Sequence, residues 1–260
     1  PTWLMAFRRH DSVRRFGRGI ERRTKRVLLK TLRVFVKAPA PQDPAKLESI
    51  HKILLLRPNY RMGNTLCSTP LIDVMRKRFP TAMLDYLGAD TTAVLLQNLS
   101  LDNVYVVSRS QILSPWRSVR LVYRLRRERY DLVVATGNGS FTDMICMVVL
   151  NARYRMGSGK WAEGACNIKT VNTDYCHAYD LPVEMAKLLG ADCRDRPFYV
   201  VSQQEKDKAI LRLSEIGFRN QQRVLPFVAL FVGGHRDERW AVDSWEGLVR
   251  RLRAVGGEGG

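Results

Sequence analysis

The chain has 260 residues, of which 45% are hydrophobic and 26% are charged, and this balance describes a globular protein and excludes a disordered one. Its formal net charge of +18 favours anionic partners such as phosphate groups, acidic lipid surfaces or nucleic acid. Five cysteines without a Cys-x-x-Cys pair argue against a disulfide framework or a structural zinc site and indicate a reducing compartment. Because no apolar run reaches the roughly 18 residues of a membrane span and no secretory signal is recognisable, we expect a cytoplasmic protein.

Residues 1–37 are strongly basic, with twelve Lys and Arg residues against Asp11 and Glu21. The pattern predicts an amphipathic helix weakened by Gly17 and Gly19. An anionic membrane surface would attract such an arm by about 1 kcal/mol per basic residue near it. A solvated arm and a nucleic-acid-binding arm are the alternatives, although no RNA-reading motif accompanies it. Residues 38–50 are rich in proline and predict a stiff linker.

After the linker, apolar runs alternate with amphipathic segments. The predicted strands are His51–Arg57, Ala82–Leu87, Val104–Val107, Asp131–Thr136 and Arg153–Gly157. The predicted helices are Thr69–Arg78, Asp90–Gln97, Trp116–Arg129 and a segment ending at Leu150. This alternation predicts an α/β domain over residues 51–200, with a doubly wound parallel sheet.

The later part of the chain predicts a second, smaller unit. We expect a polar loop over 160–180, and helices over Leu181–Leu189, Glu205–Glu215 and Ser244–Val255. The run Phe227–Val232 predicts a strand, with Trp240 and Trp245 packing the last helix against its sheet. A strand-loop-helix unit over 201–260 therefore predicts the start of a second Rossmann-like domain, and we expect this domain to be truncated.

The most informative stretch for function is Leu54–Pro80. A buried strand ends at Arg57, a loop with Arg61, Gly63 and Asn64 follows, and a helix opens at Thr69-Pro70. Ligands of open α/β sheets bind outside the carboxyl ends of the strands, so this loop faces the expected site. Gly63 allows close approach of a ligand to the backbone. Arg57 and Arg61 can hold phosphate or carboxylate groups. The alternative is that the two arginines are merely solvated.

This stretch resembles the opening of the lipopolysaccharide heptosyltransferase family, glycosyltransferase family 9. The family pattern of a strand ending in Arg, then G-D-x-[VL]-x-[TS]-x-P and [RK]-x-x-[FY]-P, corresponds to Ile53–Arg57, Gly63–Pro70 and Arg78-Phe-Pro80. Looser matches are Tyr130–Val134, Asn151–Gly157 and Phe231–Gly234 followed by Arg239-Trp240.

The resemblance implies a GT-B architecture, with an acceptor-side Rossmann-like domain and an incomplete nucleotide-sugar domain. It implies an inverting, metal-independent transfer of a heptose-like sugar from a donor such as ADP-heptose, without a cofactor. The acceptor would be a lipopolysaccharide core or related lipid-linked envelope glycan, on the cytoplasmic side of the inner membrane, where the protein would be peripheral. Arg57, Arg61, Gly63 and Thr65 would line the acceptor side, and Gly233, Gly234, His235, Arg239 and Trp240 the donor side.

The sequence departs from the family pattern at the general base, because Asn64 stands where the family has aspartate. An amide has no useful basicity at neutral pH. Three interpretations stay open: Asp90 or Asp143 acts as the base, Asn64 orients the acceptor, or the protein is a non-catalytic relative that binds an anionic glycan, a membrane surface or a partner. Both aspartates also fit a structural role as first-turn acids of helices. No histidine or cysteine spacing predicts a metal site.

Overall fold

The computed structural model describes most of the chain from residue 40 onward. The described residues are 40–58, 60–108, 115–137, 139–159, 162, 164–170, 179–193, 196–220, 223–224, 228–233 and 240–256. The predicted basic arm at 1–37 therefore lies outside the described residues. The chain divides into two compact units, Pro1–Val201 and Ser202–Gly260, each of which is considered by itself.

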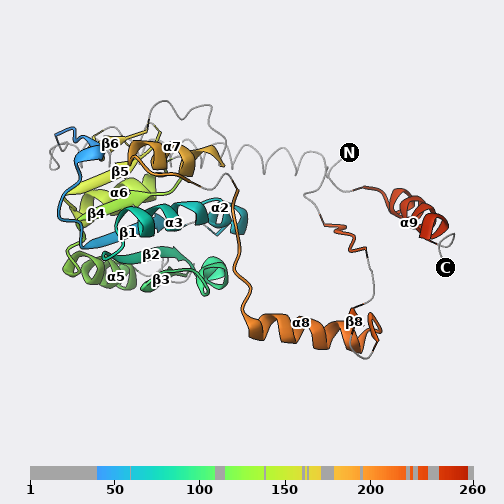
Figure 1. The fold of residues 1–260 in the computed structure, drawn as a ribbon. Helices are drawn as coiled ribbons and strands as arrows, with labels where there is room; N and C mark the ends of the chain where they lie inside the picture. Colours follow the sequence, from blue (N-terminus) through green and yellow to red (C-terminus); the bar gives the residue numbers. More distant parts are fainter. Residues whose placement is uncertain are drawn as a thin grey trace, which may run out of the picture. The chain divides into compact units, whose positions relative to one another are not determined.

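The first unit is built on a six-stranded sheet in which all strands are parallel (Figure 1). The strands are β1 (Lys52–Arg57), β2 (Met83–Ala89), β3 (Asn103–Val107), β4 (Leu132–Ala135), β5 (Tyr154–Gly157) and β6 (Ile168–Lys169). Their order across the sheet is β3-β2-β1-β4-β5-β6. This is the order of a dinucleotide-type Rossmann sheet, so the predicted doubly wound α/β fold is confirmed.

Helices cover both faces of this sheet (Figure 1). Ile53 and Leu55 of β1 pack in one core with α3 (Thr69–Arg78) and α7 (Asp180–Leu188). Leu54 and Leu56 pack in the other core with α5 (Pro115–Arg127) and α6 (Phe141–Leu150). Because successive residues of a strand point to opposite faces, the continuous apolar run of β1 serves both cores, as a buried parallel strand requires.

Two short elements differ from the predicted ones. The predicted loop after β1 contains a five-residue helix, α2 (Met62–Leu66). The predicted helix after β2 is a 3-10 helix, η2 (Asp90–Leu96). Both segments are too short for apolar periodicity to identify them. Before β1, the predicted linker forms a single 3-10 turn, η1 (Pro44–Lys46), and buries Leu47 and Ile50 against the sheet.

The predicted polar loop over 160–180 is partly wrong. Ile168–Lys169 pairs with β5 as the sixth strand, and Ala165, Cys166 and Ile168 are buried. Gln42 donates its backbone N–H to Asn167 O at 3.0 Å, which ties the segment before β1 to this edge. The strand was missed because two residues carry no alternating pattern. Residues 171–178 lie outside the described residues.

The second unit contains α8 (Gln203–Glu215), an antiparallel pair β7 (Arg219–Asn220) and β8 (Arg223–Val224), and α9 (Val242–Gly256). The strand predicted at Phe227–Val232 is not present in its described part, residues 228–232. Val228, Phe231 and Val232 are exposed there, and no described strand pairs with them. An apolar run becomes a strand only when neighbours satisfy its backbone, so propensity alone was insufficient.

Within the described residues, no helix is both long and apolar enough to cross a membrane.

Candidate active site

The sheet reverses its winding direction between β1 and β4. From β1 the chain proceeds to β2 and β3 on one side, whereas β4 leads to β5 and β6 on the other. In such sheets, the loops that follow the two central strands diverge and leave a crevice outside the carboxyl ends of the strands. Here the two loops are those that follow Arg57 at the end of β1 and Ala135 at the end of β4.

Arg57 lies between these two loops. Its guanidinium lies directly against the α-carbon of Gly137, in the space that a β-carbon there would fill. The Nε of Arg57 is buried, and it has no hydrogen-bond partner among the described residues. A buried guanidinium N–H without a partner is costly, and phosphate or carboxylate oxygens satisfy it well. The predicted anion-binding arginine therefore lies at the switch point with one donor unused.

The loop opposite Arg57 is fixed by buried hydrogen bonds. Ser158 donates its hydroxyl to Gly137 O at 2.8 Å, and the backbone N–H of Thr136 donates to Leu56 O at 3.1 Å. Ser158, which follows β5, thus holds Gly137 in the position at which it contacts the Arg57 guanidinium. The sequence alone does not reveal this contact, because it depends on β1 and β4 being neighbours.

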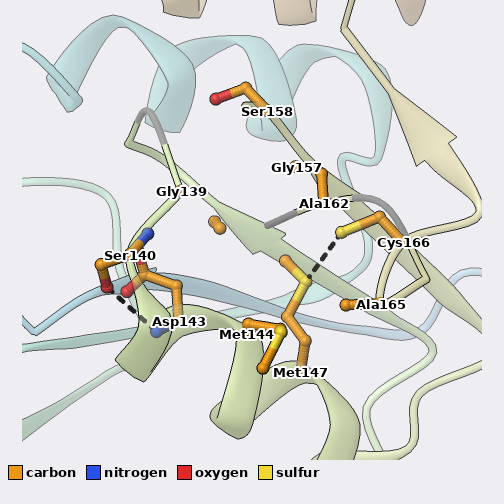
Figure 2. A pocket seen from close by; sticks show the side chains of 11 residues that line it. Gly139, Ser140, Asp143, Met144, Met147, Gly157, Ser158, Ala162, Ala165 and Cys166 are labelled. Carbon is orange, nitrogen blue, oxygen red and sulfur yellow. Dashed lines mark hydrogen bonds between the residues drawn. The ribbon is translucent and has the colours of Figure 1, made fainter. Parts of the chain in front are cut away.

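Asp143 lies beside this loop, at the first turn of α6. The backbone N–H of Ser140 donates to Asp143 Oδ2 at 2.9 Å, and the N–H of Asp143 donates to Ser140 Oγ at 3.1 Å (Figure 2). Burial raises the pKa of Asp143, while the hydrogen bonds of Ser140 and the charge of Arg57 oppose the rise. The structural role predicted for this first-turn acid is confirmed, and its catalytic role stays a prediction.

Asn64 lies in α2, directly after β1. Arg61 precedes the helix as its N-cap residue and is exposed. No atom lies within 4 Å of the position that a β-carbon on Gly63 would take, so the surface is open there. Asn64 is half-buried, and Thr65 is buried with no hydrogen-bond partner for its hydroxyl among the described residues. α2 thus places an open glycine and Asn64 at the carboxyl edge of the sheet.

Asp90 is the first residue of η2, at the end of the neighbouring strand β2, and it is exposed. Its Oδ1 accepts the N–H of Thr91 at 2.7 Å, which is the first-turn role predicted for it. Thr91 Oγ1 donates to Tyr60 O at 3.5 Å, and η2 packs against α2. Asn64 and Asp90 therefore lie on adjacent elements at one edge, while Asp143 follows β4 on the other side of Arg57.

A small pocket lies behind Asp143, between α6 and the ends of β4 and β5 (Figure 2). Its walls include Met147 and Cys166, whose sulfur atoms are 3.2 Å apart. The enclosed volume is about 10 Å³, which is roughly the space that one water molecule needs. A sugar ring does not fit, so this pocket is a packing gap, and the carboxyl edge of the sheet at Arg57 is the candidate site.

The predicted donor-side residues belong to the second unit. Gly234, His235 and Arg239 lie outside the described residues. A β-carbon on Gly233 would meet the Phe231 ring at 2.8 Å. Trp240 is exposed, and its ring centroid lies 5.0 Å from that of Trp245. The prediction that these tryptophans pack a helix against a sheet is wrong within the described residues, because the sheet that they would need is not formed there.

Among the described residues, no group of three or more His, Cys, Asp or Glu side chains is arranged to hold a metal ion.

Comparison with solved structures identifies the fold. The structure of a glycosyl transferase family 9 protein from Veillonella parvula superposes with a TM-score of 0.64 at 16% identity, over 82% of this chain and 62% of that one. The E. coli heptosyltransferase WaaC with ADP-2-deoxy-2-fluoro heptose gives a TM-score of 0.55 at 17% identity, over 79% of this chain and 66% of that one. WaaC with ADP gives 0.50 at 16% identity, over 79% and 64%.

These matches confirm at the level of the fold the resemblance that the motifs predicted. The chain spans 62 to 66% of the length of the proteins that it matches. No family model and no curated protein matches its sequence.

Proposed function

We propose that this chain forms the acceptor side of a glycosyltransferase that transfers a heptose-like sugar from a nucleotide-sugar donor, such as ADP-heptose, to a lipopolysaccharide core or related envelope glycan. The observation that carries the proposal is Arg57, which lies at the switch point against Gly137 with a buried, unused Nε donor. An anionic acceptor that enters the crevice satisfies this donor. The fold likeness to family 9 structures, one of which holds an ADP-sugar analogue, supports a nucleotide sugar as the second substrate.

In this proposal, Arg57 and Arg61 bind phosphate groups of the acceptor, and Gly63 and Thr65 border its sugar. Asn64 donates and accepts hydrogen bonds that orient the acceptor hydroxyl. The base is a carboxylate that removes the proton of that hydroxyl as it attacks the donor sugar with inversion. Asp90 is the better candidate, because it is exposed beside α2 whereas Asp143 is buried and holds the first turn of α6.

On the donor side, we propose that Gly233, Gly234, His235, Arg239 and Trp240 approach the nucleotide sugar. Cationic and backbone groups there would balance the charge of the donor diphosphate, so the transfer needs no metal ion.

A transfer assay with labelled nucleotide sugar and a lipid-linked core acceptor tests the proposal, comparing Asn64→Ala, Asp90→Asn and Asp143→Asn with the unaltered protein. Loss of the base is expected to lower kcat by about 100-fold or more in Asp90→Asn. Asp143→Asn keeps an oxygen that accepts the Ser140 N–H and should retain most of its activity. Full activity in all three variants would show that the assignment of the site is wrong.

The second candidate function is binding of an anionic glycan without transfer. The specific observation that favours it is Asn64, an amide at the position where the resemblance implies the catalytic aspartate. In the same assay, binding of the acceptor without transfer at any donor concentration would support this candidate over the enzyme.

A further inference from the structure

The outward face of α5 exposes large apolar and aromatic side chains, which a helix that only faces water does not need. The helix buries Leu125 against the sheet. On the opposite side, Trp116, Val119 and Tyr123 have exposed fractions of 84%, 59% and 63%. These residues are separated by three and four positions, so they form one stripe along the helix. No described residue covers this stripe.

The same face is uniformly cationic. The helix carries the exposed arginines Arg117, Arg120, Arg124, Arg126 and Arg127 and no acidic residue. Glu128 follows the helix, but it is bound to Lys52 Nζ at 3.0 Å. The guanidinium carbon of Arg127 lies 5.9 Å from the centroid of the Tyr123 ring. Aromatic and cationic side chains are therefore interleaved on one surface, which we call the α5 face (Trp116, Arg117, Val119, Arg120, Tyr123, Arg124 and Arg127).

The direction of α5 places one end of this face near the candidate site. The helix ends at Arg127, and β4 begins soon after at Leu132, so its last turn lies at the amino edge of the sheet. Its 13 residues span about 20 Å at the usual rise per residue. Trp116 therefore lies toward the carboxyl edge, on which Arg57 and Asp90 also lie.

The charge of the α5 face decides which partner fits it. The α5 face of a second copy would place arginines against arginines, and the basic segment 1–37 has the same sign, so neither complements it. Nucleic acid matches the charge and its bases stack on aromatic rings, but an aliphatic side chain such as Val119 is not a stacking platform. An anionic bilayer matches both features, because lipid phosphates attract the arginines while Trp, Tyr and Val enter the interface.

We propose that the α5 face docks the first unit on an anionic phospholipid surface. Trp116, Val119 and Tyr123 enter the headgroup region, and Arg117, Arg120, Arg124 and Arg127 bind lipid phosphates. Docking lays α5 along the lipid surface, with Trp116 at the end of the helix nearer the carboxyl edge of the sheet. The inference concerns binding alone and holds whether or not the crevice at Arg57 transfers a sugar.

Vesicle flotation with the full 260-residue chain tests the proposal, using phosphatidylcholine vesicles with and without phosphatidylglycerol. The test variants are Arg117→Glu with Arg120→Glu, and Trp116→Ser with Tyr123→Ser. The control is Lys77→Glu with Lys169→Glu, which makes the same change in charge at exposed positions on α3 and β6. The segment 1–37 is unchanged throughout, so its contribution is the same in every sample.

The arginine variant is expected to bind anionic vesicles about tenfold more weakly or worse, while the control changes by less than about threefold. The tryptophan-tyrosine variant is also expected to bind more weakly, because it lacks the aromatic side chains that enter the headgroup region. Equal weakening in the arginine variant and the control would overturn the proposal. So would binding of single-stranded RNA that falls in the α5 variants while vesicle binding stays constant, because the face would then be a nucleic-acid surface.

Discussion

At the scale of single residues, the proposed acceptor site depends on the contact between Arg57 and Gly137. Arg57 could be named from the sequence, because an arginine at the end of a buried strand, followed by a glycine-containing turn and a helix, points to an anion site. Gly137 could not be named, since its importance arises only when β4 pairs beside β1 and brings it against the guanidinium.

Gly137→Ala tests this contact. The new methyl group would occupy the space of the Arg57 guanidinium, which is the flexible end of a long side chain and is able to move. We therefore expect a loss of stability of only about 1 kcal/mol, together with a loss of acceptor binding as large as that of Arg57→Gln. Urea denaturation and acceptor titration measure the two effects. Unchanged binding would show that the position of the guanidinium does not matter.

Gly63→Ala is the matched comparison at an open glycine. Nothing lies within 4 Å of the added β-carbon, and the position is helical. Alanine in a helix is more stable than glycine by about 0.5–1 kcal/mol, so the midpoint of unfolding should not fall. If a ligand approaches the backbone here, acceptor binding weakens even though stability does not. A variant that binds normally would remove Gly63 from the site.

Asp143 gives a prediction about pH. Burial raises the pKa of its carboxyl, so folding favours the protonated form, and the ionised form costs stability as the pH rises. Asp143→Asn has no such titration but keeps an acceptor for the Ser140 N–H. Relative to the unaltered protein, the variant should gain stability as the pH rises above about 4. A relative loss over this range would mean that a cation stabilises the carboxylate more than burial destabilises it.

At the scale of the elements, the sequence predicted the regular strands and longer helices of the first unit to within two residues at each boundary. These strands were predictable because β1, β2 and β4 are buried almost throughout and therefore have continuous apolar sequences. The end of α3 was predictable because its last turn is a run of basic residues. α2 and β6 were missed because they contain five and two residues, and their conformation is decided by neighbours distant in sequence.

The first turn of α6 contains both the helix cap, Ser140, and the candidate site residue Asp143. Ser140 caps the helix and also donates its backbone N–H to Asp143. Ser140→Ala should cost about 1 kcal/mol of stability and raise the pKa of Asp143 further, because one of the groups that lowers it is removed. Thermal unfolding and carboxyl NMR titration follow the two quantities. Ser202→Ala makes the same change in the capping box of α8, remote in sequence, and should leave Asp143 unaffected.

At the scale of the whole molecule, the two units differ in how much they bury. The first has a core on each face of its sheet, whereas α8 has no buried residue. Phe227–Val232 has a strand-like composition, but composition could not reveal that its described residues lack a pairing neighbour. The residues predicted for the acceptor side could therefore be located relative to a buried sheet. Gly233 and Trp240, which were predicted for the donor side, have no such sheet around them among the described residues.

Hydrogen exchange tests this difference. Amides that require unfolding of a core exchange slowly, while those of an exposed helix exchange by local opening. We expect the amides of β1 and β4 to exchange about 100-fold more slowly, or slower still, than those of α8. Similar protection in α8 would show that its faces are covered.

The most direct test of the central claim is calorimetric titration of a phosphorylated lipid-core glycan into the chain, for the unaltered protein, Arg57→Gln and the control Lys77→Gln. If the crevice at the switch point is the acceptor site, Arg57→Gln weakens binding about tenfold or more, because a charge-assisted hydrogen bond is lost, and Lys77→Gln binds like the unaltered protein. Equal affinities for Arg57→Gln and the unaltered protein would contradict the account.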